Sequence, residues 1–383
     1  MSSIQQAYQK AIDVLNACVR PKGFYASGLK GGYEAVWARD SMIAALGASL
    51  VGVKFNEPFA NSLELLSKNQ SNLGQIPNCV GSYNTDRKSD VTFNTIDSSL
   101  WYIIGHNIYT RAYNNKNFLN KYAVNISKAF FWLKHQDPDE VGVLAQQPTM
   151  DWMDAFPHKY GYTINTNALY YAVLMILGHK KEAMNLQKII NGQKNKYISL
   201  YNNKLGYYYS WGWKNHEQYR EHEEWFDSAG NLLAIITGLA SPKIAKNILK
   251  FIEDKKINQP YGCKTIWPPI KKGDKEWHDY FDNCDAREAY HYSNAGIWPF
   301  IGAFYVVALV KTKNYKKAEA ELENLAQANL QKLKIRDFKE GYEFNEWLDG
   351  RDGQPKGEPY QAWSAGSYIY AYECVQQKKV LWF

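Results

Sequence analysis

Apolar residues recur at helical spacing along most of this chain. In residues 4–18 the apolar positions share one face, with the period of an amphipathic helix: Ile4, Tyr8, Ala11, Ile12 and Leu15. The same pattern predicts twelve helices, over residues 4–18, 41–53, 58–68, 96–112, 119–134, 165–178, 180–191, 228–239, 243–253, 295–311, 314–331 and 363–375. Strand-like runs are few and short, at 206–211 and 142–145. These patterns predict a protein of the all-α class.

The connections between the predicted helices are alternately short and long. The long ones are rich in Trp, Tyr, Asp, Glu, Asn and Gly, over residues 22–40, 74–95, 145–165, 205–227, 260–297 and 338–362. No hinge rich in Pro, Ser and Gly separates two halves. Paired helices with such loops after alternate helices predict an α/α toroid whose loops line one mouth. We expect one domain over residues 1–383, and two helical subdomains are the alternative.

The composition is that of a globular protein with many aromatic residues. Apolar residues make up 45% and charged residues 22% of the chain, which excludes extended disorder, while aromatic residues reach 15%. The net charge of +7 comes from 45 basic and 38 acidic residues spread over the whole chain. Nucleic-acid binders concentrate basic residues on one face and interleave stacking aromatic side chains. No nucleic-acid partner is therefore expected.

Features of membrane and exported proteins are missing from the sequence pattern. No run approaches the roughly 18 consecutive apolar residues of a membrane-spanning helix. The first ten residues lack the charged and then apolar regions of a secretory signal. The five cysteines are scattered and form no CxxC pair, so neither a disulfide framework nor a zinc site is indicated. We expect a cytoplasmic protein.

Two of the long loops end in acidic residues just before an apolar helix. The first carries Trp37, Arg39 and Asp40, and the second carries Asp97. Either aspartate could serve only as an N-cap that accepts backbone N–H groups. That alternative leaves the tryptophan and the arginine without a role. Because sugars are bound by flat aromatic faces and by carboxylates, these loops are candidate sugar-binding segments.

Two further loops carry carboxylates among aromatic residues. The loop ahead of residue 165 holds Asp151, Trp152 and Asp154, which suits a general acid in a partly apolar pocket. The loop over residues 342–363 holds five acidic residues: Glu343, Glu346, Asp349, Asp352 and Glu358. Some of them are expected to be ordinary turn residues, because two Asp-Gly dipeptides occur there. Two carboxylates from distant loops that meet across a sugar are the minimum chemistry of a glycosidase.

Other catalytic motifs are absent from the sequence. It contains no P-loop, no GxGxxG after a strand, no HExxH and no GxSxG. The eight histidines are scattered and form no spaced metal-ligand set. We therefore expect no metal ion and no organic cofactor.

Several motifs resemble known carbohydrate-active families. VWARDSMIAA, GQIPN, FNTIDSSLWYI, DWMDA and NTNALYYAVL resemble the glucosidase domain of glycogen debranching enzymes. WFDSAGNLLAIITGLAS, YSNAGIWP and NEWLDGRDGQPKGEPYQAWSAGSY resemble the alkaline/neutral invertases of glycoside hydrolase family 100. Both families belong to the inverting glycosidases built as (α/α)6 toroids. The resemblance extends over about residues 30–375 and implies that fold for this chain.

The resemblance also implies roles for individual residues. The presumed general acid falls on Asp154, and the presumed base that activates water falls on Glu346. Inversion predicts that these two carboxyl groups lie about 6.5–9.5 Å apart. The candidate substrate-binding residues are Trp37, Arg39, Asp40, Asp97, Trp152, Asn294, Trp298, Gln361 and Trp363. Whether Asp151, Glu343 or Asp349 contributes is left open.

These implications lead to an expected function. We expect an inverting, exo-acting glycosidase that removes a terminal α-linked glucose from a small-molecule or oligosaccharide substrate. The chain departs from the invertases after the acid, where it has Ala155 and Phe156, and again over residues 292–296. Sucrose hydrolysis, a glucosyl-glycerate type substrate, a non-catalytic carbohydrate-binding protein and a helical scaffold are the alternatives. The oligomeric state is left open.

Overall fold

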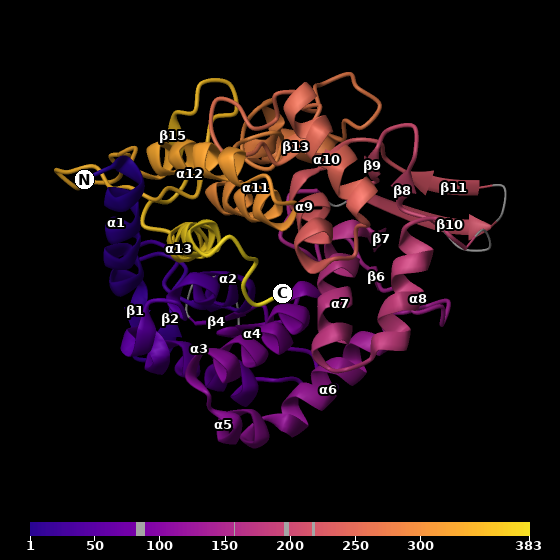
Figure 1. The fold of residues 1–383 in the computed structure, drawn as a ribbon, viewed down its shortest axis with the longest axis horizontal. Coiled ribbons are helices and arrows are strands. Elements are labelled where there is room, and N and C mark those ends of the chain that lie inside the picture. The colour runs from indigo at the N-terminus through magenta and orange to yellow at the C-terminus, as the bar shows by residue number, and fades with distance from the viewer. Residues whose placement is uncertain (82–88, 157, 195–198, 217–218) are drawn as a thin grey trace.

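Six helices form an inner ring in the computed structural model, which describes residues 1–81, 89–156, 158–194, 199–216 and 219–383. These are α2 (Ala38–Ala48), α4 (Asp97–Tyr113), α7 (Ile164–Ile176), α9 (Ser228–Thr237), α11 (Pro299–Lys311) and α13 (Ala362–Gln376). Each packs against the next in this order, and α13 packs against α2, so the ring closes (Figure 1). This ring is the inner layer of the predicted toroid.

An outer helix precedes or follows each inner helix. The outer helices are α1 (Ser3–Cys18), α3 (Asn56–Lys68), α6 (Ala123–Lys134), α8 (Lys180–Ile190), α10 (Pro242–Asp254) and α12 (Tyr315–Asn329), with the short α5 (Lys116–Lys121) ahead of α6. α1 packs against α12 and α13, so the start of the chain meets its end. Six inner and six outer helices confirm the all-α class and the (α/α)6 toroid.

The two layers differ in how much of each helix is apolar. Every residue of α11 from Pro299 to Val310 is buried, because the inner helices contact neighbours on all sides. In α10 the buried residues repeat at helical spacing along one face: Ile244, Ala245, Ile248, Leu249 and Ile252. An inner helix must therefore be apolar nearly all round, while an outer helix needs only one apolar stripe.

Close contact between α2 and α13 depends on two glycines. A Cβ on Gly47 would lie 2.0 Å from the carbonyl oxygen of Gly366. A Cβ on Gly366 would lie 2.2 Å from the carbonyl oxygen of Ala44. Neither helix could approach the other so closely with a larger residue at these positions.

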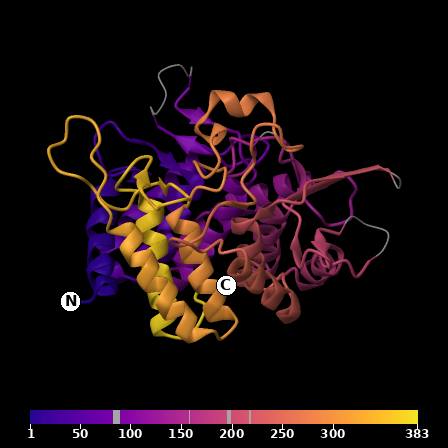
Figure 2. The same ribbon diagram turned by 90° about the horizontal axis from the view of Figure 1, so that it is seen from above.

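The strands are short and belong to the loops. They are β1 (Val19–Arg20), β2 (Gly23–Phe24), β3 (Val36–Trp37), β4 (Cys79–Val80), β5 (Val91–Thr92), β6 (Ala145–Gln146), β7 (Gly161–Thr163), β8 (Tyr201–Asn202), β9 (Tyr207–Tyr208), β10 (Trp211–His216), β11 (Tyr219–His222), β12 (Phe226–Asp227), β13 (Ile266–Trp267), β14 (Trp347–Leu348) and β15 (Pro355–Lys356). The largest sheet among the described residues has the order β11-β10-β7-β6, and its neighbours are antiparallel. Figure 2 shows the long connections gathered along one side of the helix ring.

Several expected boundaries differ from the structure. The helix expected over 119–134 is divided between α5 and α6, and the strand expected over 142–145 lies instead at Ala145–Gln146. The helix expected over 295–311 begins at Pro299, because Ile297 forms bridges with Lys264 and Leu348 in extended backbone and the proline starts the helix. The strand expected over 206–211 is divided between β9 and β10. The helix expected over 41–53 ends at Ala48 and is followed by a 3-10 turn over Gly52–Phe55. Among the described residues, no helix has the length and apolar character needed to cross a bilayer.

Candidate active site

The N-terminal ends of the inner helices carry many of the expected site residues. Trp37 is the N-cap residue of α2, and Trp298 is that of α11. Asp97 is the first residue of α4, and Gln361 is the N-cap residue of α13. Because the long loops lead into these ends, the toroid brings residues from distant segments to one mouth. The positive end of a helix dipole also favours carboxylates there.

Arg39 is the centre of a buried charge cluster. Its Nη1 lies 3.0 Å from Oδ2 of Asp97, and its Nε lies 3.8 Å from Oδ2 of Asp40. The N-cap residues of α2 and α4 are Trp37 and Ile96, so neither aspartate is an N-cap residue. Both carboxylates face the guanidinium of Arg39.

Burial changes the ionisation of this cluster. It raises the pKa of Asp40 to about 6 although the Arg39 charge acts in the opposite direction. Burial also raises the pKa of Asp97, again against the influence of Arg39. Burial alone would lower the pKa of Arg39, but the carboxylates of Asp97, Asp40 and Asp154 raise it. Arg39 thus stays charged and can compensate carboxylates in a site that excludes water.

Asp154 and Glu346 line the same pocket, although they come from loops far apart in the sequence. The pocket has a volume of about 480 Å³. Its other lining residues are Tyr33, Ala155, Cys284, Asp285, Tyr292, Trp347, Gly357 and Glu358. Two carboxyl groups in one open pocket of this size can act on opposite sides of a sugar ring.

Glu346 is buried in the wall of this pocket, with 7% of its surface exposed. Its Oε1 accepts a hydrogen bond of 3.2 Å from the hydroxyl of Tyr33, and its Oε2 accepts one of 3.2 Å from the backbone N–H of Glu358. Burial raises the pKa of Glu346 to about 8, and these two donors act against that rise. A Cβ on Gly357 would lie 2.6 Å from Oε2, so only glycine fits beside this carboxyl group.

Asp154 is exposed to the pocket and is otherwise enclosed by protein atoms. This burial raises the pKa of its carboxyl group, the Arg39 charge opposes the rise, and the Asp151 charge adds to it. A carboxyl group with a raised pKa keeps its proton to higher pH, as a general acid requires.

Three of the expected tryptophans form one aromatic cluster. The ring centroids of Trp152 and Trp298 lie 5.4 Å apart, and those of Trp298 and Trp363 lie 5.5 Å apart. Trp298 also contacts Tyr292, which lines the pocket. Indole nitrogens of Trp152 and Trp363 and the amide nitrogen of Gln361 are buried without a hydrogen-bond partner among the described residues. Such donors can be satisfied by an ordered water molecule or by a bound ligand.

None of the nine expected substrate-binding residues lines this pocket, and the side chain of Asn294 is in addition fully bonded to backbone groups. Its amide nitrogen donates hydrogen bonds of 2.8 Å to the carbonyl oxygens of Ile270 and Ala286. Its amide oxygen accepts one of 2.8 Å from the N–H of Ile270. The side chain, which is fully buried, therefore holds two loop segments together rather than facing a substrate.

The three carboxylates left open by the sequence all have basic partners. Asp151 forms an ion pair with Lys159 at 2.8 Å. Glu343 lies 3.8 Å from the ammonium of Lys10. Asp349 is paired with Arg351, and hydrogen bonds from that side chain help to lower its pKa to about 2 although burial acts the other way. None of the three lines the pocket.

Several pocket residues were not expected from the sequence. Tyr33 lies in the loop that was selected for Trp37, Arg39 and Asp40. Glu358 and Gly357 lie in the loop over residues 342–363, in which Glu346 was the expected base. Tyr292 has a positive φ of 45°, which local sequence does not indicate. Cys284 also lines the pocket, and burial raises the pKa of its thiol. Among the described residues, no group of three His, Cys, Asp or Glu could hold a metal ion.

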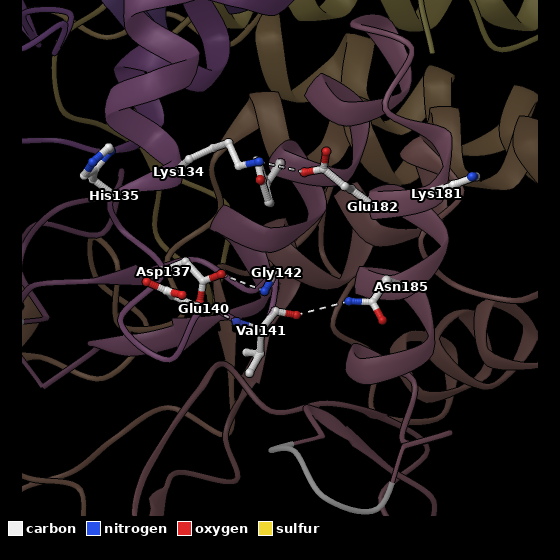
Figure 3. Close-up of a pocket in the computed structure, with 10 residues that line it drawn as sticks. Lys134, His135, Asp137, Glu140, Val141, Gly142, Lys181, Glu182 and Asn185 are labelled. Carbon is white, nitrogen blue, oxygen red and sulfur yellow. Dashed lines mark hydrogen bonds and ion pairs between the residues drawn. The ribbon is translucent and has the colours of Figure 1, made fainter.

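A second cavity of about 750 Å³ lies elsewhere, between α6, α7 and α8 (Figure 3). Its polar groups are bonded to one another: Lys134 pairs with Glu182 at 3.2 Å, and Asp137 accepts backbone N–H groups of Val141 and Gly142. None of the expected site residues lines it. The larger volume of this cavity therefore does not make it the candidate active site.

Two plant invertases are similar to part of this chain. Probable alkaline/neutral invertase A of Arabidopsis thaliana is 26% identical over 160 residues, which are 40% of this chain and 23% of the invertase. Probable alkaline/neutral invertase D of Arabidopsis thaliana is 29% identical over 153 residues, which are 38% of this chain and 26% of that protein. The matched region thus spans about a quarter of the length of these relatives.

A solved structure shares the fold over nearly the whole chain. The mannosylglycerate hydrolase of glycoside hydrolase family 63 from Thermus thermophilus, in complex with Tris and D-glycerate, has a TM-score of 0.69 and 14% identity, with 95% of this chain and 99% of that chain covered. The same enzyme has also been solved with glucose. The family model described as amylo-alpha-1,6-glucosidase matches residues 15–370. The chain therefore belongs to the amylo-alpha-1,6-glucosidase family of glycoside hydrolases.

Proposed function

We propose that this protein is an inverting, exo-acting glycosidase that releases a terminal α-linked glucose. The observation that carries the proposal is the presence of Asp154 and Glu346 in the wall of one pocket. Asp154 protonates the leaving glycosidic oxygen, while Glu346 removes a proton from the attacking water. Both carboxyl groups have raised pKa values because of burial, and neither step uses a cofactor.

The other expected residues receive supporting roles in this mechanism. Arg39 and Asp40 bind hydroxyl groups of the glucose in the innermost subsite, and Asp97 holds Arg39 in place. The aromatic cluster around Trp298 supports the apolar surface of the sugar ring. Tyr33 and the backbone N–H of Glu358 orient the base. We further propose that residues 1–383 act as one cytoplasmic domain on short glucose chains.

Sucrose is a second candidate substrate because the invertases are similar to part of this chain. The two functions differ in their products, since sucrose hydrolysis yields fructose as well as glucose. The same pocket carboxylates would serve either reaction.

A product assay tests the proposal. Wild type, Asp154→Asn and Glu346→Gln would be incubated with isomaltose, panose, maltotriose, trehalose, sucrose and a branched limit dextrin. Glucose release from an α-glucan by wild type, reduced about 10²–10⁴-fold in each variant, is the expected result. Release of glucose and fructose from sucrose alone would replace the glucosidase proposal with the invertase one. Proton NMR of the first product anomer would decide between inversion and retention.

A further inference from the structure

Lys159 is a buried lysine that the proposed reaction does not use. Only 1% of its side chain is exposed, and its Nζ lies 2.8 Å from Oδ2 of Asp151 and 2.9 Å from Oδ2 of Asp227. Burial alone would lower the pKa of Lys159, but the two carboxylates raise it. The three side chains therefore form a charged group in the protein interior, where ions need compensation on all sides.

Each aspartate of this group also binds backbone with its other oxygen. Oδ1 of Asp227 accepts a hydrogen bond of 3.1 Å from the N–H of Gly230, and Asp227 thereby caps the inner helix α9. Oδ1 of Asp151 accepts one of 2.9 Å from the N–H of Met153. Lys159 thereby connects a rigid inner helix to the backbone immediately before Asp154.

The segment around Asp154 is held at several further points. Backbone hydrogen bonds of 3.1 Å from Phe156 to Met153, and of 3.0 Å from Lys159 to Phe156, form consecutive turns. Two residues before Asp154, the ring of Trp152 packs against Trp298, with ring centroids 5.4 Å apart. Two residues after Asp154, the ring of Phe156 packs against the aromatic rings of Trp225 and Phe281. The ion pairs hold the segment at its two ends, Asp151 and Lys159.

We propose that Lys159 is a positioning residue for the general acid. By pairing with Asp151, it joins the two ends of the segment that contains Asp154 and keeps the general acid at a fixed distance from the substrate. The inference rests on the proposed role of Asp154. A general acid must lie within hydrogen-bond reach of the leaving oxygen, and a displacement of about 1 Å can cost about 10²-fold in rate.

Removing Lys159 itself is a poor test, since two buried carboxylates would lose their counter-charge and the protein would be strongly destabilised. Asp151→Asn and Asp227→Asn form a matched pair instead. Each leaves Lys159 with one carboxylate, and asparagine can still accept the backbone hydrogen bond. Only Asp151→Asn releases the turn that carries the acid from the lysine.

The substrates isomaltose and α-glucosyl fluoride separate an effect on the acid from a general effect on the fold. Fluoride leaves without protonation by the enzyme, so its release needs little help from Asp154. We expect Asp151→Asn to lower kcat on isomaltose about 10–100-fold with KM changed less than about three-fold, and to lower kcat on the fluoride only a few-fold. We expect Asp227→Asn to keep at least about half of kcat on both substrates.

Asp154→Asn supplies the reference in the same assay. If it keeps wild-type turnover of isomaltose, the proposed function itself is wrong. If Asp154→Asn is inactive but the two matched variants lose activity equally, the positioning role of Lys159 is refuted. An equal loss on isomaltose and on the fluoride in Asp151→Asn would refute it as well, because that result reports a general distortion of the pocket.

Discussion

The buried carboxyl group of Glu346, the proposed base, should lower the stability of the folded protein as the pH rises, and Glu346→Gln tests this. The carboxyl group is buried, and burial raises its pKa from 4.5 to about 8. Glutamine keeps the size of the side chain and cannot ionise. Its amide can still accept from the N–H of Glu358, while the hydroxyl of Tyr33 can accept from the amide nitrogen. The substitution therefore removes the charge and leaves the packing.

The pKa difference sets the size of the effect. The folded protein holds the proton on Glu346 more tightly than the unfolded chain does, so its contribution is fully present below the unfolded pKa of 4.5 and is lost as the pH rises toward 8. Each unit of pKa difference corresponds to about 1.4 kcal/mol. Between about pH 5 and about pH 8 the wild type should lose about 3 kcal/mol relative to Glu346→Gln.

Thermal unfolding at several pH values measures this difference. For a chain of this length, 3 kcal/mol corresponds to a Tm change of about 4 °C. We expect the Tm of Glu346→Gln, relative to wild type, to increase by that amount between about pH 5 and about pH 8. Any constant cost of the substitution cancels in the comparison between the two pH values.

A neighbouring aspartate provides the control. Asp349 lies in the same loop and is buried to a similar extent, with 4% exposed, but hydrogen bonds from Arg351 help to lower its pKa to about 2 although burial acts the other way. Asp349→Asn should therefore show no gain in relative stability between about pH 5 and about pH 8, because this carboxyl group is ionised over that range in both the folded and the unfolded protein. If Glu346→Gln also shows none, the carboxyl group is ionised at neutral pH in the folded protein, and the reasoning from burial is refuted.

The remaining predictions concern the same pocket. Because Glu346 must lose its proton to act as a base, kcat/KM on α-glucosyl fluoride, which needs no protonation by Asp154, should rise with pH through an apparent pKa of about 8; a profile without that rise would contradict the role of Glu346. Gly357→Ala should lower kcat at least about ten-fold and cost about 1–3 kcal/mol in urea unfolding, since its Cβ would lie 2.6 Å from the base. Gly178→Ala has a similar positive φ with no atom within 4 Å, so it should cost only the backbone strain and keep kcat. Arg39→Leu should destabilise the protein by about 3–5 kcal/mol because Asp97 is left buried without its counter-charge. Adding Asp97→Asn should recover most of that loss, and equal stability of the single and double variants would contradict the pairing.

Much of the fold could be predicted from the sequence, because helical periodicity is a local property. Periodicity predicted a helix both at α10, whose buried residues follow one face, and at α11, which is buried nearly all round. The start of α11 was misplaced, since bridges from Ile297 to distant segments hold the preceding residues extended. Helix ends depend on such contacts, which no window of sequence contains.

Part of the site was also accessible from sequence. The loop positions of Asp154 and Glu346, and their resemblance to known motifs, were sufficient to name them as a pair. The capping alternative for Asp97 could not be decided, because the same residue at the same helix start can cap or can pair with Arg39. Only the position of the neighbouring inner helix decides between the two.

The sequence by itself determined which segments are helices and which loops carry carboxylates and aromatic residues. Only the tertiary structure decided that Tyr33 and Gly357 adjoin Glu346, that Asn294 bonds to backbone, and that Lys159 joins Asp151 to α9. The physical reason is that closing the ring of inner helices fixes the distances between loops far apart in the chain. Burial, pairing and the pKa of each carboxyl group follow from those distances.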